Sequence, residues 1–505
     1  MKNNFLPMIL LVGSIALSGC TRLEEQLFGQ ITDRDEGNID IPSLLQGAYF
    51  STRAALQTPE SWWALQELTT DEAIAPTRGG DWDDNGAWRA LFLHLWQPDH
   101  IRMNQVFRDI NAISYAATDI LRYNPDTQQA AQARFLRAFA QNFVLDGWGQ
   151  VPYREPGDGI ATLPIVRNAQ EQLDYLIAEL TEIIPNLPVW TVNNSVFANQ
   201  DAGRVLLMKV YLNRAVYLNR AQPAFDNSDM QNVIELADQI IGSGRFSLTD
   251  NYFDSFSPNN RGASENIFLG ANTGGSNSGP IFNFIRIPLH YSMNPSGNNG
   301  WTTLSNFYDK FEPQDQRRGG PYPGVTERSG LHMGFIVGQQ FNSAGEILQD
   351  RRSNPLIFTP EVSIIERGNN LELTGIRVVK YVPDYDNIGS NFANNDWVFY
   401  RYSDVLLMKA EALLRMNNQA QALQYVNMVR TRRQASVMTS LSLDDMLDEL
   451  GREFYWEGRR RTDLIRFGRY LDTWQEKPAS DPRALLFPIP QTQLGNMNYN
   501  QNPGY

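Results

Sequence analysis

Cysteine and histidine are nearly absent from this chain. Cys20 is the single cysteine in 505 residues, so no disulfide can form within the chain and its stability has to come from packing. The four histidines show no metal-ligand spacing such as H-E-x-x-H; they are His94, His100, His290 and His332. We therefore expect no zinc site, no histidine-based catalytic triad and no cofactor.

Basic residues are also in deficit. The chain has 43 Lys and Arg against 56 Asp and Glu, a net charge of −13. This balance argues against a nucleic acid or an anionic lipid surface as the partner. Long hydrophobic runs are missing as well, apart from FLPMILLVGSIAL near the start, which is too short to remain as a membrane-spanning helix.

The apolar run has the pattern of an export signal. Lys2 gives it a positive beginning, and it ends in LSGC, Leu17 to Cys20. This end resembles a bacterial lipobox, in which the cysteine becomes the lipidated N-terminus; the alternative is an ordinary secretory signal followed by an accidental cysteine. We expect a signal peptide over residues 1–19 and a lipid anchor, with palmitate among its acyl chains, on Cys20. The mature protein is then anchored to a membrane and does not span it.

Most of the remaining pattern is helical. In AAQARFLRAFAQNFVLDGWG, Phe135, Phe139 and Phe143 recur every four residues, which predicts a buried helix face that Gly147 and Gly149 end. Further helices are predicted at 102–122, 168–185, 203–219, 229–241, 402–416, 418–433, 442–457 and 461–474.

One internal repeat stands out among these helices. VLLMK occurs at Val205–Lys209 and again at Val405–Lys409, and a second amphipathic helix follows each copy. Two helical hairpins of this kind are typical of tetratricopeptide-like units. Because the copies are not consecutive, we expect a helical scaffold that carries a long insertion.

Residues 245–400 form that insertion. The segment is rich in Asn, Gly, Ser and Pro, as in GANTGGSNSGP and NPSGNNGW, and short β-like runs interrupt it: IFNFIRIPL, HMGFIVGQQF and TGIRVVKYV. Long loops inside a globular chain are usually functional or disordered, and the aromatic residues and strands here favour ordered, functional loops.

A second loop-rich segment, residues 50–100, holds five of the 11 tryptophans. Trp62 and Trp63, next to LQEL, are expected to pack a helix start, and Trp96, in the apolar stretch LFLHLW, is expected in the core. The stretch GDWDDNGAW, Gly80 to Trp88, instead places two tryptophans among Asp, Asn and Gly, the residues of a solvated turn. A tryptophan in such a loop cannot easily reach a core, so we expect Trp82 and Trp88 to serve as platforms, with Trp82 the stronger candidate; the alternative is that one of the two anchors the loop.

The chain resembles the SusD/RagB family of outer-membrane glycan-binding lipoproteins. The resemblance rests on fragments that follow the family's order: LSGC, GAYF, TDEAIAPTRGGDWDDNGAW, ARFLRAFAQNFVLDGWGQVPY, RYSDVLLMKAEALLR, REFYWEGRRRTDLIRFG, FPIP and NQNPGY. It implies a mainly α fold, a SusD-like helical scaffold with tetratricopeptide-like hairpins and with long loops and short β-strands on one face. It also implies a SusC-like TonB-dependent transporter barrel as the partner, at the outer membrane and facing the cell exterior.

The resemblance to this family also implies a domain organisation. After the signal peptide we expect an N-terminal SusD-like helical region at 20–245 and a C-terminal RagB/SusD region at 246–505. The latter comprises the loop-rich insertion 246–400, helices over 401–475 and a C-terminal tail. The two regions are expected to form one compact globule.

Sugar chemistry explains the choice of binding residues. The C–H face of a sugar ring suits an aromatic face, and its hydroxyl rim needs donors and acceptors such as Asp, Asn and Arg. The family often adds a second aromatic residue from its central region, which here points to the loop between Tyr291 and Trp301. The candidate ligand-binding residues are Asp71, Arg78, Asp81, Trp82, Asp83, Trp88, Tyr291, Trp301, Arg377 and Trp397.

Two other functions compete with glycan binding and delivery. An endo-acting glycosidase would need two facing carboxylates, for which the 71–88 loop offers Asp81, Asp83 and Asp84. The carboxylates of REFYWEGRRRTDLIRFG are better explained by ion pairs that tie such a helix to its neighbours. A transporter lid without glycan affinity, serving peptide or other cargo, is the third possibility. The family is non-catalytic, so we expect a binding protein and no enzyme.

Overall fold

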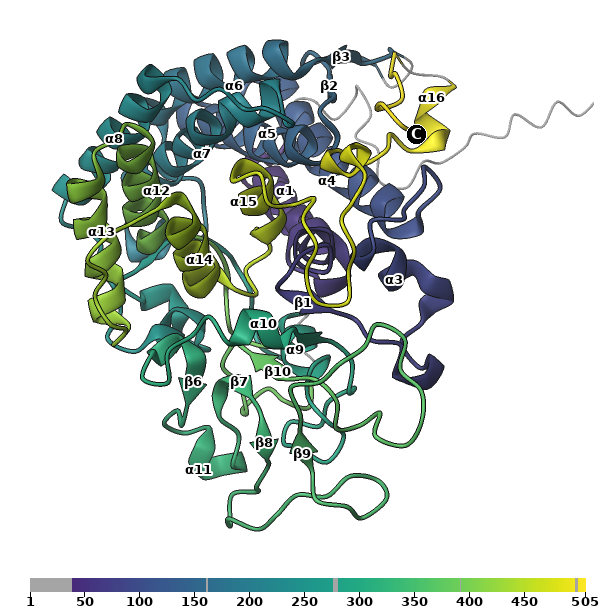
Figure 1. Cartoon of the computed structure of the whole chain (residues 1–505). Coiled ribbons are helices and arrows are strands. Elements are labelled where there is room, and N and C mark those ends of the chain that lie inside the picture. The colour runs from purple at the N-terminus through teal and green to yellow at the C-terminus, as the bar shows by residue number, and fades with distance from the viewer. Residues whose placement is uncertain (1–38, 160–161, 276–279, 391, 496–497) are drawn as a thin grey trace, which may run out of the picture. The chain divides into compact units, whose positions relative to one another are not determined.

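Helices supply most of the ordered framework (Figure 1). The computed structural model describes residues 39–505, apart from 160–161, 276–279, 391 and 496–497. Residues 41–505 form one compact unit. The predicted signal peptide and the lipid anchor at Cys20 lie outside the described residues.

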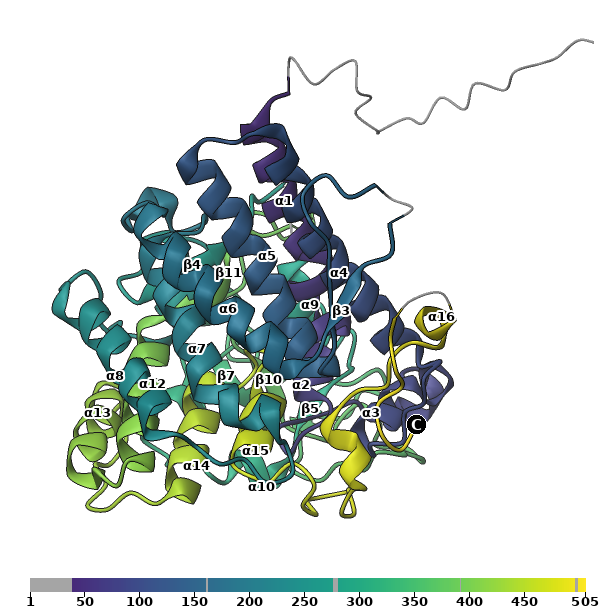
Figure 2. The ribbon, with the colours of Figure 1, turned by 90° about the horizontal axis from the view of Figure 1, so that it is seen from above.

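The long helices form a continuous row. They are α1 (Ile41–Leu56), α4 (Ile101–Ile120), α5 (Thr127–Trp148), α6 (Ala169–Ile183), α7 (Gln200–Leu218), α8 (Asn227–Gly242), α12 (Tyr402–Arg415), α13 (Gln419–Arg432) and α14 (Leu443–Phe454). Successive helices pack from α4 to α8, and α8 then packs on α12, which packs on α13 (Figure 2). The two VLLMK hairpins, α7–α8 and α12–α13, are therefore neighbours in space although residues 243–401 separate them. This arrangement confirms the predicted scaffold of tetratricopeptide-like hairpins.

Local sequence signals set the helix ends. At the start of α5 the Asp126 carboxylate accepts from the Gln128 and Gln129 amides, and the Gln129 side chain accepts from the Asp126 amide in return. The same helix continues through Gly147 and ends at Trp148, where Gly149 adopts a left-handed conformation with φ of 72°. The Phe135, Phe139 and Phe143 stripe of this helix meets Phe268 and Phe399, so it packs on the insertion.

The insertion adds short antiparallel strands to the helical body. They are β4 (Asn266–Gly270), β5 (Thr302–Thr303), β6 (Gly319–Gly320), β7 (Met333–Ile336), β8 (Gly338–Gln339), β9 (Ile357–Phe358), β10 (Arg377–Val379) and, at its end, β11 (Trp397–Arg401). They pair as β10–β7–β6, β11–β4 and β8–β9, and strands β6 to β9 lie together at the lower end of the view in Figure 1.

One strand pair brings the tryptophan-rich segment to the insertion. β1 (Ala73–Ile74) pairs with β5, with Ala73 opposite Thr303 and Ile74 opposite Thr302. The loop after β1 and the loop before β5 therefore start from the same short sheet. This pairing positions the candidate site. A separate strand pair, the hairpin of β2 (Val151–Tyr153) with β3 (Ile165–Arg167), lies near α4 (Figure 2).

Two predicted elements were wrong. The apolar run at 281–289 contains helix α9 (Ile281–Arg286), because a short, fully apolar segment does not distinguish a buried strand from a buried helix. The helix predicted at 461–474 is α15 (Arg460–Arg466), and the chain turns at Gly468, whose φ is 69°. Among the residues that the structure describes, no helix combines the length and the apolar character needed to cross a bilayer.

Candidate functional site

Trp82 lies where the loop after β1 meets the loop before β5. Its indole Nε1 donates to the Asn298 carbonyl at 3.1 Å, and its ring meets Trp301 edge to face with centroids 6.0 Å apart. The side chain is half-buried, so part of the indole remains accessible. Gly300 permits this contact, because a Cβ at that position would lie 2.6 Å from Cζ2 of Trp82.

Trp88 corrects the expectation that both tryptophans stand in an open loop. GDWDDNGAW ends in a helix, α3 (Ala87–Phe92), and Trp88 points inward from it with only 1% of its surface exposed. Its Nε1 donates to Asp84 at 2.5 Å, and its ring contacts Trp301. Because neither face is open, Trp88 is no platform in this structure; it anchors the loop that presents Trp82.

Trp301 and Trp397 are also core residues. Trp301 stacks on Trp63 with centroids 5.3 Å apart and planes 3° apart, beneath Trp82 and Trp88. Trp397 in β11 stacks on Tyr381 instead, with centroids 5.4 Å apart. Both predictions of a binding role assumed an accessible ring, and the burial of both rings corrects that assumption. Burial of Trp96 confirms the core position predicted for it, and Trp62 and Trp63 are buried directly before helix α2 (Ala64–Glu67), at the helix start predicted for them.

Arg78 and Arg377 are buried, and their hydrogen bonds hold the loop before β5 in place. Nε and Nη2 of Arg78 both donate to the Gly300 carbonyl, and Nη1 pairs with Glu366 at 3.0 Å. Nη2 of Arg377 donates to Oδ1 of Asn299 at 2.8 Å. Burial lowers the pKa of Arg78 to about 10, although Glu366 opposes the shift. These arginines position the site, and they do not present free guanidinium groups on its rim.

Two predicted acidic residues serve other contacts. Asp71 makes a two-point ion pair with Arg460 of α15, at 2.8 and 2.9 Å. Asp83 pairs with Arg89 at 2.9 Å across the turn into α3. Asp84 accepts from Trp88, as described above, and lies 3.9 Å from Arg102. Of the three aspartates offered for a glycosidase, Asp83 and Asp84 therefore have structural partners, while Asp81 faces a recess.

This recess has polar walls and a volume of about 80 Å³; we call it the Asp81 recess. Its lining residues are Arg78, Asp81, Asn299, Asp350, Arg351, Arg352, Asn369, Leu371 and Glu372. They come from the loop after β1, the loop before β5 and two turns of the insertion. Tyr291 adjoins the recess, because the Arg351 guanidinium lies 4.4 Å above its ring. The structure thus brings together four predicted residues: Arg78, Asp81, Trp82 and Tyr291.

Glu372 and His290 hold Arg351 in place. Nε of Arg351 donates to Oε1 of Glu372 at 2.5 Å, and the buried His290 contacts Oε2 at 2.8 Å. Burial raises the pKa of Glu372, but the hydrogen bonds from Arg351 and His290 outweigh it and lower the pKa below its ordinary value. The carboxylate therefore stays charged and orients the guanidinium over Tyr291.

Sequence reasoning missed the 350–372 side of the recess. RRSNP (351–355) and NNLELT (369–374) show only the ordinary signals of a turn, namely Arg, Ser, Asn and Pro next to a few apolar residues. Their approach to Asp81 depends on tertiary contacts such as the bond from Nη1 of Arg78 to the Leu371 carbonyl. No spacing within the chain indicates that contact.

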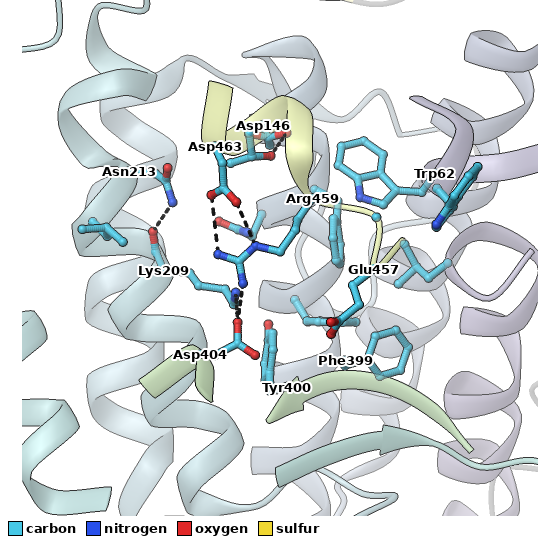
Figure 3. A pocket seen from close by; sticks show the side chains of 18 of the residues that line it. Trp62, Asp146, Lys209, Asn213, Phe399, Tyr400, Asp404, Glu457, Arg459 and Asp463 are labelled. Carbon is cyan, nitrogen blue, oxygen red and sulfur yellow. Dashed lines mark hydrogen bonds and ion pairs between the residues drawn. The ribbon is translucent and has the colours of Figure 1, made fainter. Parts of the chain in front are cut away.

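A second cavity, of about 110 Å³, lies inside the helical body (Figure 3). Arg459 occupies its centre, with Nη1 2.6 Å from Asp404 and Nε 3.2 Å from Asp463. Lys209 of α7 also donates to Asp404, at 2.9 Å. Glu457, Phe399 and, farther out, Trp62 lie on the side of Arg459 that faces away from Lys209 (Figure 3).

The charged groups of this interior cavity form ion pairs with one another or with charged groups beside the cavity. Glu457 accepts from both Lys380 and Arg401, and Asp463 also accepts from Arg466. These contacts confirm that the carboxylates of REFYWEGRRRTDLIRFG are ion-pair partners. The cavity joins α5, α7, α12 and α15, and its chemistry is that of a structural junction. The Asp81 recess, with an exposed aspartate and a half-buried indole beside it, is the better candidate for ligand binding.

Comparison with known proteins agrees with this architecture. Residues 242–481 match the model of the SusD family. The starch-binding protein SusD of Bacteroides thetaiotaomicron is 24% identical over 495 residues, which cover 87% of this chain and 84% of that protein.

Solved structures show the same fold. A SusD-like protein from Bacteroides fragilis superposes with a TM-score of 0.73 at 17% identity, covering 94% of this chain and 99% of that one. The surface glycan-binding protein A from Bacteroides thetaiotaomicron, in complex with laminarihexaose, gives a TM-score of 0.69 at 19% identity over 92% of this chain and 98% of that one. The chain therefore has the SusD-like, mainly α fold. The family model covers residues 242–481, just under half of the chain, and this region is similar to the SusD family.

Proposed function

We propose that this protein is a cell-surface lipoprotein that captures oligo- or polysaccharide and delivers it to a SusC-like TonB-dependent transporter. The ligand lies on Trp82 and Tyr291 and reaches into the Asp81 recess. The observation that carries the proposal is the half-buried Trp82 indole beside a recess with polar walls, in which Asp81 and Arg351 line the rim. Relatives named for starch binding and for surface glycan binding support the choice of ligand.

The geometry favours weak binding and fast release. An aromatic contact contributes about 1 kcal/mol beyond the area it buries, and only Trp82 and Tyr291 offer rings here. The hydroxyl rim of a sugar would find acceptors in Asp81 and donors in Arg351 and Arg352. A protein that passes its ligand to a transporter needs this kind of modest affinity.

The binding role is tested by affinity electrophoresis in gels that contain starch or laminarin. We expect retardation of the unmodified protein in at least one gel, and loss of it in Trp82→Ala and in Asp81→Ala. Asp250→Ala, which removes an exposed aspartate elsewhere, is the matched control and should be retarded normally. Asp81→Ala should leave the thermal midpoint unchanged, because the Asp81 side chain is exposed. Normal retardation of both site variants would place glycan binding elsewhere on the protein.

The same protein separates binding from hydrolysis. Incubation with the retained polysaccharide should release no new reducing ends. Reducing sugar that disappears in Asp81→Asn would establish the glycosidase instead. A protein that no polysaccharide retards, yet that co-purifies with its transporter, would be a lid for other cargo.

The anchor and the partner need separate tests. Metabolic labelling with palmitate should mark the full chain, and Cys20→Ala should abolish the label and release the protein from the outer membrane. Co-purification with a TonB-dependent barrel from detergent-solubilised membranes should accompany the labelled form. Retention of Cys20→Ala in the membrane, without label, would contradict the lipid anchor.

A further inference from the structure

A third hollow, on the outer face of α4, has features that neither the Asp81 recess nor the interior cavity explains. It has a volume of about 220 Å³ and lies between α4, the β2–β3 hairpin and the C-terminal tail near α16 (Gln491–Leu494). Figure 1 places this region at the upper right, while β8 and β9, whose connection carries Arg351 and Arg352, lie at the lower end. The two sites are therefore on different parts of the unit.

One face of α4 supplies most of the wall. Phe107, Asn111, Ser114, Tyr115 and Thr118 follow the spacing of neighbouring helical turns and all line the groove. Tyr115 keeps 46% of its surface exposed and lines the groove, so its ring is accessible to a ligand. Pro152 and Pro164 face it from the hairpin and add further C–H surface.

One unsatisfied polar atom lies in the wall of the same groove. Asn111 donates through Nδ2 to the Phe107 carbonyl at 2.8 Å, which fixes its amide, yet its Oδ1 is buried and has no hydrogen-bond partner among the described residues. A buried acceptor without a donor costs about 1–3 kcal/mol. Ser114 and Tyr499 bring hydroxyl groups to the same wall, and Gln493 brings a half-buried side-chain amide.

We propose that this groove is a second carbohydrate-binding site, which takes one neutral hexose ring, with Tyr115 as the stacking platform and Asn111 as an acceptor for a hydroxyl group. The volume is larger than the 150 Å³ that holds a benzene molecule in an engineered cavity, so it suits a single six-membered ring with its substituents. Aromatic and proline surfaces match the C–H face, while the amide and hydroxyl groups, together with the guanidinium groups of Arg108 and Arg154 that also line the groove, match the rim. None of the lining residues in the described chain is a carboxylate, so the acid pair of a glycosidase is missing from this groove.

The site is independent of the proposed capture function, and its test is designed to keep the two apart. Saturation-transfer NMR is recorded on the Trp82→Ala protein with methyl α- and β-D-glucopyranoside and methyl β-D-galactopyranoside, each at several millimolar. We expect transfer to the ring protons of at least one glycoside, with a Kd on the order of 1 mM. Tyr115→Ala in the same background should reduce the signal at least fivefold, and Asn111→Ala should also reduce it.

Phe50→Ala is the matched control, because Phe50 is equally exposed, at 46%, and also lies on a long helix, α1. It should leave the transfer unchanged. An equal loss in Phe50→Ala and Tyr115→Ala, or no transfer from any of the three glycosides, would overturn the second site. Loss of affinity-gel retention in Trp82→Ala with retained NMR transfer would show that only the first site carries polysaccharide capture.

Discussion

At the scale of single residues, the fate of each tryptophan depends on what the chain packs against it. Trp82 and Trp88 have similar neighbours in sequence, yet one is half-buried and the other is enclosed. The sequence correctly indicates that GDWDDNGAW carries aromatic and acidic groups together. It could not indicate that Trp88 begins a helix that turns inward to Trp301, because Trp301 lies in another segment of the chain.

Gly300 offers a residue-scale test of how Trp82 is held. Gly300→Ala would place a Cβ against the indole, so we expect the ring to move, glycan retention to fall at least tenfold and stability to drop by about 1–3 kcal/mol. Urea denaturation and affinity electrophoresis measure the two effects. Gly389→Ala is the control, since a Cβ there meets no atom within 4 Å. Unchanged retention in Gly300→Ala would mean that glycan binding does not depend on the position of the Trp82 indole against Gly300.

At the scale of elements, helices with strong periodicity were predicted well and turns were not. The predicted bounds of α4, α6, α7 and α8 agree with the structure to within about three residues, because amphipathic spacing and capping residues are local signals. α15 ends earlier than predicted because the chain turns at Gly468, and its Arg460, Arg461 and Arg466 are buried against acidic groups of other elements. No local pattern distinguishes such an ion-paired helix from an exposed one.

A pair of buried glutamates ties α2 (Ala64–Glu67) and the start of β1 to the turn before α15. Oε1 of Glu67 accepts from the amides of Gly458 and Arg459, and Oε1 of Glu72 accepts from the amide of Trp456. The other oxygen of each is buried without a protein donor among the described residues. Burial raises the pKa of Glu67 to about 7, and burial together with Glu67 raises the pKa of Glu72 well above its ordinary value.

These raised pKa values predict a loss of stability with rising pH. Between the unfolded value of 4.5 and about 7, the folded state binds more protons than the unfolded state, so the free energy of unfolding falls as the pH increases through this range. Glu72→Gln keeps an acceptor for Trp456 and supplies an amide donor to Glu67. It should raise stability by roughly 1–3 kcal/mol at pH 8 and flatten the dependence. Urea denaturation from pH 5 to pH 9 measures this, with the exposed Glu361→Gln as control. An identical pH slope in Glu72→Gln and the unmodified protein would contradict the raised pKa values of Glu67 and Glu72.

At the scale of the whole unit, the insertion and the helical row are held together by a buried ion network. Glu453 of α14 lies at its centre and contacts Arg317 of the insertion, Arg401 at the end of β11 and Arg433 after α13. Glu265, which precedes β4, joins Arg401 and Arg433 from the other side. Each of these side chains is fully buried, so removal of one partner leaves an uncompensated charge.

This network predicts that residues 41–505 unfold as one cooperative unit. Glu453→Gln should lower the free energy of unfolding by about 3–5 kcal/mol, because three arginines lose their shared carboxylate. Burial opposes ionisation of Glu453, but the three arginines outweigh it and hold the pKa of this carboxyl far below its ordinary value, so the loss should be the same from pH 5 to pH 8. Fluorescence reports on the 11 tryptophans, among them Trp301 of the insertion stacked on Trp63, whereas far-ultraviolet circular dichroism reports on the helical row. The two transitions should shift together in Glu453→Gln, as coincident probes require of a two-state unit. The control Glu361→Gln should shift neither transition. A fluorescence transition that separates from the dichroism transition would show that the insertion unfolds on its own. In that case the ion network does not couple the insertion to the helical scaffold.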